Sequence, residues 1–193
     1  MEKAFNTKET LLFRVQNNMD SWDEFTSVYE RYIYLIIRAM KINHHDAEDL
    51  TQNVLLKVWK NIANYEYNPD HARFRTWLSR ICRNQVIDFV RKKKTDDNKI
   101  INNYIEAEQI TQPQVEALAE EEWKAHVSTA AWENIQSDFK TEAMSCFEMI
   151  NDGRPVADIA KNLNLSESSV YVYSKRVRDN LIAEVRRLNN SWN

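Results

Sequence analysis

Glycine and proline are scarce in this chain. Its 193 residues include a single glycine, Gly153, and three prolines. Hairpins, phosphate-binding loops and dinucleotide-binding folds need glycine where the backbone takes conformations that other residues tolerate poorly. The sequence therefore argues against those folds and predicts an all-α protein, in which helices are joined by short polar turns.

Length and bulk composition are those of an ordinary globular protein. A chain of 193 residues can form one large or two small domains, and 43% of its residues are hydrophobic against 28% charged. No apolar run approaches the roughly 18 residues of a membrane span. The N-terminus also lacks the apolar core of a secretory signal. We therefore expect a cytoplasmic protein without membrane insertion.

The cysteines and histidines do not form a metal-binding pattern. Cys82 and Cys146 stand alone in apolar surroundings, with no CxxC pair. Such cysteines are usually buried thiols. His44 and His45 are adjacent, so on a helix they diverge by about 100° and cannot share a metal as an i, i+4 pair would. We expect no disulfide, no metal and no cofactor.

Charge is segregated along the chain. The net charge is -3, yet residues 73–94 hold eight basic residues and one acidic residue, a net of +7. Residues 104–142 hold nine acidic and two basic residues, a net of -7, and residues 154–188 hold seven basic and four acidic residues, a net of +3. Two basic modules around an acidic spacer favour two nucleic-acid-binding domains on a tether. We expect a domain at 1–94, a flexible linker at 95–113 and a second domain at 114–193.

The basic stretch has two faces if it is helical. Apolar side chains fall opposite a polar stripe. The polar stripe contains Arg73, Arg80, Arg83, Asn84 and Arg91, and the apolar face contains Phe74, Leu78, Ile81, Cys82 and Phe89. A solvated face is the simplest interpretation of a charged stripe, but solvated faces normally mix both signs of charge, and this one has no acid to pair with. The stripe therefore indicates an anionic partner, either nucleic acid or a membrane surface. In the free protein, we expect the acidic spacer or the second module to mask it.

The first module should contain two amphipathic helices before the basic one. Ser21 and Glu24 have the spacing of a capping box. A second helix should start after Asn43, with Ala47, Leu50, Val54, Val58 and Ile62 facing inward. Its outward residues near the start are Asp46, Glu48, Asp49, Gln52 and Asn53. Their favourable interaction with the helix dipole is enough to explain an acidic start.

The second module has the spacing of a helix-turn-helix. After predicted helices over 115–135 and 141–150, Gly153 should stop a helix, and Pro155 suits the first turn of the next. Ala160 is small enough for a close approach of two helices, and Asn164 tolerates the positive φ of the turn. Ser166 should then cap the last helix.

Three motifs together resemble a known family. DAEDLTQNVLLKVW, FRTWLSRICRNQVIDFVRKKK and GRPVADIAKNLNLSESSVYVYSKRVRDNL follow one another in this order. They resemble regions 2.2, 2.3–2.4 and 4.2 of bacterial sigma factors of the sigma-70 family, extracytoplasmic-function (ECF) type. The resemblance implies a region 2-like helical bundle and a region 4-like helix-turn-helix on a flexible linker. It also implies no catalysis.

The resemblance assigns a partner to each candidate site. The acidic helix start, Asp46, Glu48, Asp49, Gln52 and Asn53, would dock on the β′ clamp helices of core RNA polymerase, and a further contact would be made with the β flap. The promoter −10 element would be read and melted by Asn68, His71, Arg73, Arg75, Trp77, Arg80, Arg83, Asn84 and Arg91. Residues 67–71 would receive a base flipped from the duplex. The −35 element would be read by Ser168, Ser169, Tyr171, Val172, Lys175, Arg176 and Arg178. A separate anti-sigma factor would be a further partner.

Two other functions remain open at this point. A two-domain operator-binding regulator would use the helix-turn-helix without polymerase, and it would have no need of residues 46–94. A membrane-surface protein would use the basic stripe, but no broad apolar face accompanies that stripe. An enzyme ranks low, because the sequence offers no convincing nucleophile, phosphate loop or metal triad.

Overall fold

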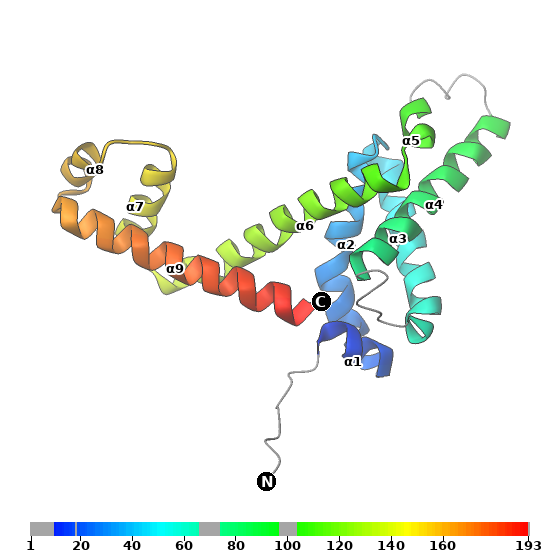
Figure 1. The fold of residues 1–193 in the computed structure, drawn as a ribbon, viewed down its shortest axis with the longest axis horizontal. Coiled ribbons are helices and arrows are strands. Elements are labelled where there is room, and N and C mark those ends of the chain that lie inside the picture. Colours follow the sequence, from blue (N-terminus) through cyan, green and yellow to red (C-terminus); the bar gives the residue numbers. More distant parts are fainter. Residues whose placement is uncertain (1–9, 18, 66–73, 97–103, 193) are drawn as a thin grey trace, which may run out of the picture. The chain divides into compact units, whose positions relative to one another are not determined.

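The computed structural model describes residues 10–17, 19–65, 74–96 and 104–192, and every regular element in those ranges is a helix (Figure 1). The all-α prediction is confirmed. The α-helices are α1 (Leu11–Asn17), α2 (Trp22–Ala39), α3 (His44–Asn61), α4 (Phe74–Asp96), α5 (Ile105–Gln109), α6 (Gln112–Ile135), α7 (Thr141–Asn151), α8 (Val156–Leu163) and α9 (Glu167–Trp192). Short 3-10 turns lie at Met19–Ser21, Ile62–Asn64 and Gln136–Asp138.

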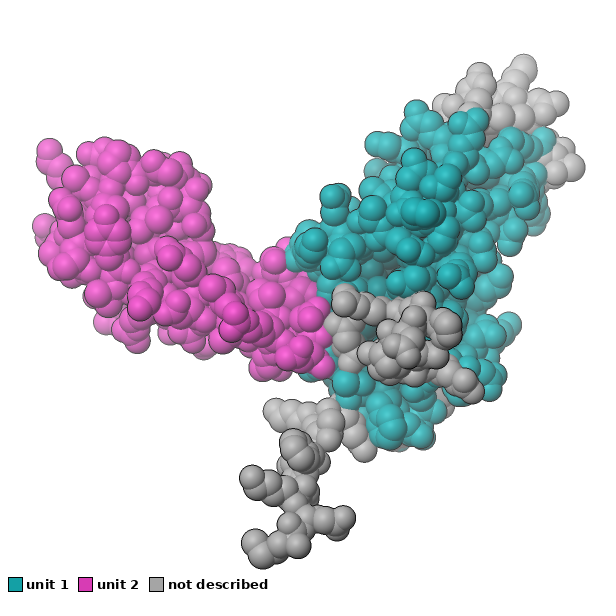
Figure 2. Space-filling model, in the orientation of Figure 1, with its two compact units in different colours: residues 1–125, 191–193 teal, residues 126–190 magenta. Residues whose placement is uncertain are grey.

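The chain divides into two compact units (Figure 2). Unit 1 is Met1–Ala125 with Ser191–Asn193, and unit 2 is His126–Asn190. The division falls inside α6, later than the predicted linker at 95–113. The described parts of that linker, residues 95–96 and 104–113, belong to unit 1, where Tyr104 and Ala107 are buried. Polar composition indicated a break in this segment, but it could not show that a few apolar side chains anchor it.

The core of unit 1 is an aromatic cluster on α2. Phe25 and Tyr29 stack at 4.5 Å between ring centroids, and Phe74 of α4 lies edge-on 5.3 Å from Tyr29. Trp123 of α6 stacks on Tyr29 at 5.7 Å. The buried hydroxyl of Tyr32 donates to the carbonyl of Ala119 at 2.9 Å, so this polar group keeps a partner inside the core. These contacts fix the start of α4 and the first half of α6 against α2.

One predicted helix start is confirmed and another is wrong. The Asn43 side chain accepts the backbone N–H of Asp46 at 2.9 Å and caps α3. Ser21 makes no capping hydrogen bond, because it ends a 3-10 turn and its ψ is 3° instead of extended. Glu24 bonds Arg14 of α1 at 2.7 Å instead of returning to the Ser21 backbone. Its ion pair ties α1 to α2.

Unit 2 contains the predicted helix-turn-helix, α8 and α9, preceded by α7. Gly153 ends α7 at φ +76°, and Asn164 ends α8 at φ +53°. Pro155 is the N-cap of α8, one position before the first turn. Ser166 accepts the N–H of Ser169 at 3.1 Å and caps α9 as predicted. The core between the helices is formed by Cys146, Ile159, Ala160 and Val170.

None of the helices in the described ranges is long and apolar enough to cross a membrane.

Candidate functional site

The start of α3 carries an acidic rim. Glu48, Asp49, Gln52 and Asn53 are all exposed, as the helical spacing predicts. His44 lies 3.6 Å from Glu48 one turn earlier, and Gln52 donates to Glu30 of α2 at 2.8 Å. We call Glu48, Asp49, Gln52 and Asn53 the α3 rim. Glu48 and Gln52 thus have partners within unit 1, and all four side chains of the rim are exposed.

Asp46 departs from the predicted outward face. Its side chain is buried and accepts a hydrogen bond from the Tyr104 hydroxyl at 2.6 Å. Lys93 of α4 donates to both carboxylate oxygens at 2.9 Å, and Asn43 donates to one at 2.8 Å. Asp46 therefore joins α3, α4 and the segment before α5. A helical wheel of α3 alone cannot show that other elements cover this position.

The contacts of Asp46 shift the pKa values of Asp46 and Tyr104 in opposite directions. Burial raises the pKa of Asp46, but the hydrogen bonds from Tyr104 and Lys93 outweigh it and leave the pKa below its usual value. Burial and the hydrogen bond to the Asp46 carboxylate raise the pKa of Tyr104 to about 12. At neutral pH the site therefore contains a carboxylate, an ammonium and a neutral phenol.

A hollow of about 550 Å³ lies beside the α3 rim. Its lining comes from α2 and α3 and includes Glu30, Tyr34, His44, Glu48 and Asp49. Tyr34 and His44 are hydrogen-bonded at 2.9 Å across it. Carboxylates from both helices line this hollow, so it suits basic side chains of a partner.

Two exposed apolar residues extend the rim along α3. Leu56 is 58% exposed and Trp59 is 40% exposed. They follow Asp49 and Gln52 at helical spacing, so they continue the same face of α3. The predicted inward set, Ala47, Leu50, Val54, Val58 and Ile62, is buried as expected. Sequence reasoning missed Leu56 and Trp59, although large apolar residues outside the buried stripe were the available signal.

The predicted polar stripe lies on the accessible side of α4. Arg80, Asn84 and Arg91 are exposed, while Phe74, Leu78 and Cys82 are buried beneath them. Arg83 is half-buried, and its Nε donates to the carbonyl of Ile110 at 2.9 Å. The described part of the stripe therefore offers three accessible polar side chains and one that is engaged by the spacer.

Of two other candidates on α4, Arg75 is placed differently from expectation, and Trp77 packs partly against the core. Arg75 is buried, lies 3.4 Å from Glu120 and covers the Trp123 ring at 4.8 Å. This position is inward, because the aromatic core accepts the flat guanidinium through a cation–π contact. Trp77 is half-buried against Tyr65 and Phe74, with centroid distances of 5.0 and 5.4 Å.

The candidates Asn68, His71 and Arg73, and the predicted base-receiving loop at 67–71, lie outside the described residues.

The outward face of α9 matches the prediction for the second module. Tyr171 and Val172 are 59% and 54% exposed, and Lys175, Arg176 and Arg178 are exposed beside them. Val170, Ser174 and Val177 on the opposite side are buried. Ser168 is exposed and Ser169 is half-buried, and both hydroxyls contact the Ser166 hydroxyl, at 2.9 and 2.8 Å. The first turns of α9 thus present polar, apolar and cationic side chains together.

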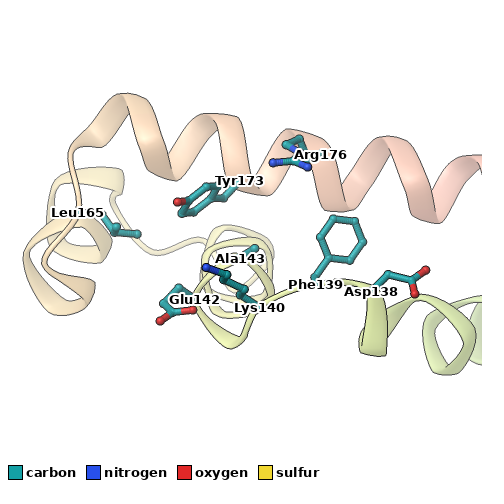
Figure 3. Close-up of a pocket in the computed structure, with 8 residues that line it drawn as sticks. All are labelled: Asp138, Phe139, Lys140, Glu142, Ala143, Leu165, Tyr173 and Arg176. Atoms are coloured by element: carbon teal, nitrogen blue, oxygen red, sulfur yellow. The ribbon is translucent and has the colours of Figure 1, made fainter.

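A hollow of about 450 Å³ lies next to this face (Figure 3). Phe139, Ala143, Leu165 and Tyr173 give it an apolar part, and Arg176 of α9 borders it. The remaining lining residues are Asp138, Lys140 and Glu142. The hollow is small and amphipathic, which suits one or two side chains of a protein partner.

No group of three or more His, Cys, Asp or Glu side chains that could hold a metal ion occurs in the part of the chain that the structure describes.

The α3 rim and the cationic helix α4 fall within one recognised family segment. Residues 26–95, from α2 to the end of α4, match the family described as Sigma-70 region 2. The matched segment contains both the predicted docking surface and the described part of the predicted −10 surface. Within residues 26–95, the match agrees with the resemblance to sigma-70 region 2 that the motifs indicate.

Three curated relatives are named ECF RNA polymerase sigma factors. SigW of Bacillus subtilis is 35% identical over 81 residues, which are 42% of each chain. SigE of Mycolicibacterium smegmatis is 36% identical over 78 residues, 40% of this chain and 29% of the relative. SigM of Bacillus subtilis is 34% identical over 74 residues, 38% of this chain and 43% of the relative. The chain matches less than half the length of each of these relatives.

A solved structure of CnrH in complex with the cytosolic domain of CnrY aligns with 92% of this chain and 96% of its own. The sequence identity is 17% and the TM-score is 0.34.

Proposed function

We propose that this chain is a dissociable initiation subunit of RNA polymerase, which docks on the core enzyme and directs it to promoters. The observation that carries the proposal is the sigma-70 region 2 match over residues 26–95, which contains an acidic rim on α3 and a cationic face on α4. Surfaces of opposite charge next to each other suit a protein that bridges a basic protein surface and nucleic acid.

Docking would use the α3 rim, its hollow and the apolar pair Leu56 and Trp59. Carboxylates steer a basic partner and select its orientation, whereas apolar and aromatic side chains supply most of the affinity at interface centres. Trp59 is already oriented, because it packs edge-on against Trp22 at 4.7 Å. Less side-chain entropy is then lost on binding. The partner with a matching basic surface would be the β′ clamp helices of core polymerase.

Nucleic-acid contact in unit 1 would use Arg80, Asn84 and Arg91 on α4. Arginine holds phosphate and asparagine can bond a base edge, so this face combines positioning with readout. The face lies opposite the buried side of α4, and the aromatic core holds that helix rigidly. With residues 67–73, these side chains would read and hold open the −10 element.

Unit 2 would read the −35 element through the exposed face of α9. The left-handed turn at Asn164 and the Ser166 cap determine where α9 begins after α8, as in a helix-turn-helix. Tyr171 and Val172 would lie against base edges, and Lys175, Arg176 and Arg178 would hold phosphate. The amphipathic hollow beside Arg176 would leave room for the second predicted polymerase contact, the β flap.

Run-off transcription with core RNA polymerase tests the proposal. We expect the chain to direct core enzyme to start sites that share an upstream sequence and that core enzyme alone does not use. Starts identical to those of core alone would contradict the proposal. If the free chain also bound particular sites tightly, the operator-binding regulator would be the better description.

A further inference from the structure

The acidic spacer runs along α4 and engages its cations. α5 lies beside α4 in unit 1 (Figure 1). The contacts extend from one end of α4 to the other: Glu108 with Lys94, the Ile110 carbonyl with Arg83, Gln112 with Ser79, and Glu120 with Arg75. Carboxylate and carbonyl oxygens thus occupy positions on a helix whose net charge is strongly positive.

The C-terminal part of α4 is held most closely. Tyr104 places its hydroxyl on Asp46, and Asp46 bonds Lys93 through both oxygens. The Lys93 ammonium also lies 4.8 Å above the Phe89 ring and 5.9 Å from the Tyr104 ring. About one third of the Lys93 and Lys94 side chains remains exposed. Both cations of this end are therefore occupied by acceptors from outside α4.

These acceptors are of the kind that a nucleic acid would supply. Phosphate oxygens, carboxylates and carbonyls all accept hydrogen bonds from Lys and Arg, and the charged acceptors compete for the same ammonium or guanidinium. A lysine paired with Glu108 cannot also neutralise a phosphate at full strength. An anion that binds these cations must first break their contacts with the spacer. The free energy of those contacts therefore lowers the affinity of α4 for the anion.

We propose that residues 104–120 form an intramolecular strap, which competes with single-stranded nucleic acid for α4 and withholds Lys94 and Arg83 in the free protein. The inference rests on the proposed nucleic-acid role of α4, but it needs no polymerase. It differs from simple packing of the spacer, because packing alone would not oppose binding of an anion.

The strap is suited to release. Ion pairs that are partly exposed are individually weak and are screened by salt, so a polyanion that makes several contacts at once can displace them. The pair of Asp46 and Lys93 lies outside the strap and should stay intact, since the Asp46 carboxylate is buried and accepts three side-chain donors. Release should therefore begin at Glu108 and Glu120.

The spacer offers a matched pair of variants for the test. Glu108→Gln with Glu120→Gln removes two carboxylates that contact α4. Glu106→Gln with Glu121→Gln removes two exposed carboxylates of the same segment that line a different surface hollow. Both variants change the net charge equally. Binding of a labelled 20-nucleotide single strand to the full-length chain is then measured by fluorescence anisotropy at fixed salt.

We expect the E108Q/E120Q chain to bind the single strand roughly threefold to tenfold more tightly than the E106Q/E121Q chain. Equal affinities for the two variants would overturn the proposal, because net charge alone would then explain any gain. The E108Q/E120Q chain could bind the single strand more tightly while the chain fails to direct transcription by core polymerase. That result would support the strap and contradict only the proposed function.

Hydrogen exchange of the unchanged protein gives a second readout that does not depend on a variant. If the single strand displaces the strap, the backbone amides of α5 should exchange faster at saturating oligonucleotide. Unchanged or slower exchange in α5, with the oligonucleotide bound, would contradict displacement.

Discussion

At the scale of single residues, Asp46 joins α3, α4 and the segment before α5. Its carboxylate accepts hydrogen bonds from three side chains: Asn43 at the start of α3, Lys93 of α4 and Tyr104 of the spacer. A buried carboxylate is stable only when its oxygens are bonded in this way. The residue is thus a structural junction next to the α3 rim, in contrast to the exposed Asp49 three positions later.

Replacing Asp46 by Asn should lower the free energy of unfolding at pH 7 by about 1 to 3 kcal/mol, because the Lys93 ammonium would lose its charged acceptor. The pKa of Asp46 is below its ordinary value of 3.8, so its contribution is present above that pH and is lost as the pH falls through the lower, folded value. The difference in the free energy of unfolding between the unaltered protein and the Asp46→Asn variant, measured in urea, should therefore disappear in acid. As a control, Asp88→Asn at an exposed position of α4 should leave the free energy of unfolding unchanged at both pH values. A difference that persists in acid would contradict an ionic role.

Asn164 carries the turn between α8 and α9 at φ +53°. Side chains with a Cβ and no local hydrogen-bonding group pay for this left-handed conformation. We expect Asn164→Ala to lower the free energy of unfolding by about 1 kcal/mol, while Asn164→Gly leaves the thermal midpoint unchanged or raises it. A destabilising glycine variant would show that the Asn side chain, and not the backbone conformation, matters.

At the scale of helices, the sequence predicted exposure or burial where a residue's position depends on one helix alone. Periodicity predicted the buried stripe of α3 and the exposed Arg80, Asn84 and Arg91 of α4, because each depends only on its own helix. Arg75 and Asp46 were misplaced because their burial depends on side chains of α6 and residue 104, which are distant in sequence. The Ser21 capping box failed for a similar reason, since an ion pair with α1 was available to Glu24.

Charge reversal on the α3 rim tests the role of that surface. Asp49→Lys with Gln52→Lys should weaken binding to core polymerase at least tenfold, because two lysines would face a basic partner. Both positions are exposed, so the thermal midpoint should change little. Glu133→Lys with Gln136→Lys makes the same change in charge at exposed positions of unit 2. Equal polymerase affinity of the two variants would remove the docking assignment.

At the scale of the whole molecule, the charged segments of the chain are distributed over both units. The two basic modules fall in different units, with α4 in unit 1 and the first turns of α9 in unit 2. The acidic spacer is divided between them, because its first part packs on α4 and its later part runs through α6 into unit 2. The segregated charges therefore hold the spacer on α4 within unit 1, in addition to their proposed role in binding partners.

Co-elution of the purified chain with core RNA polymerase on a sizing column, at near-physiological salt, tests the central claim most directly. We expect one peak that contains both, since the α3 rim, Leu56 and Trp59 are exposed in the free chain. The peak should lose the chain when Asp49 and Gln52 are replaced by lysine. Separate peaks for the unaltered chain and the polymerase, with no inhibitor present, would contradict the account.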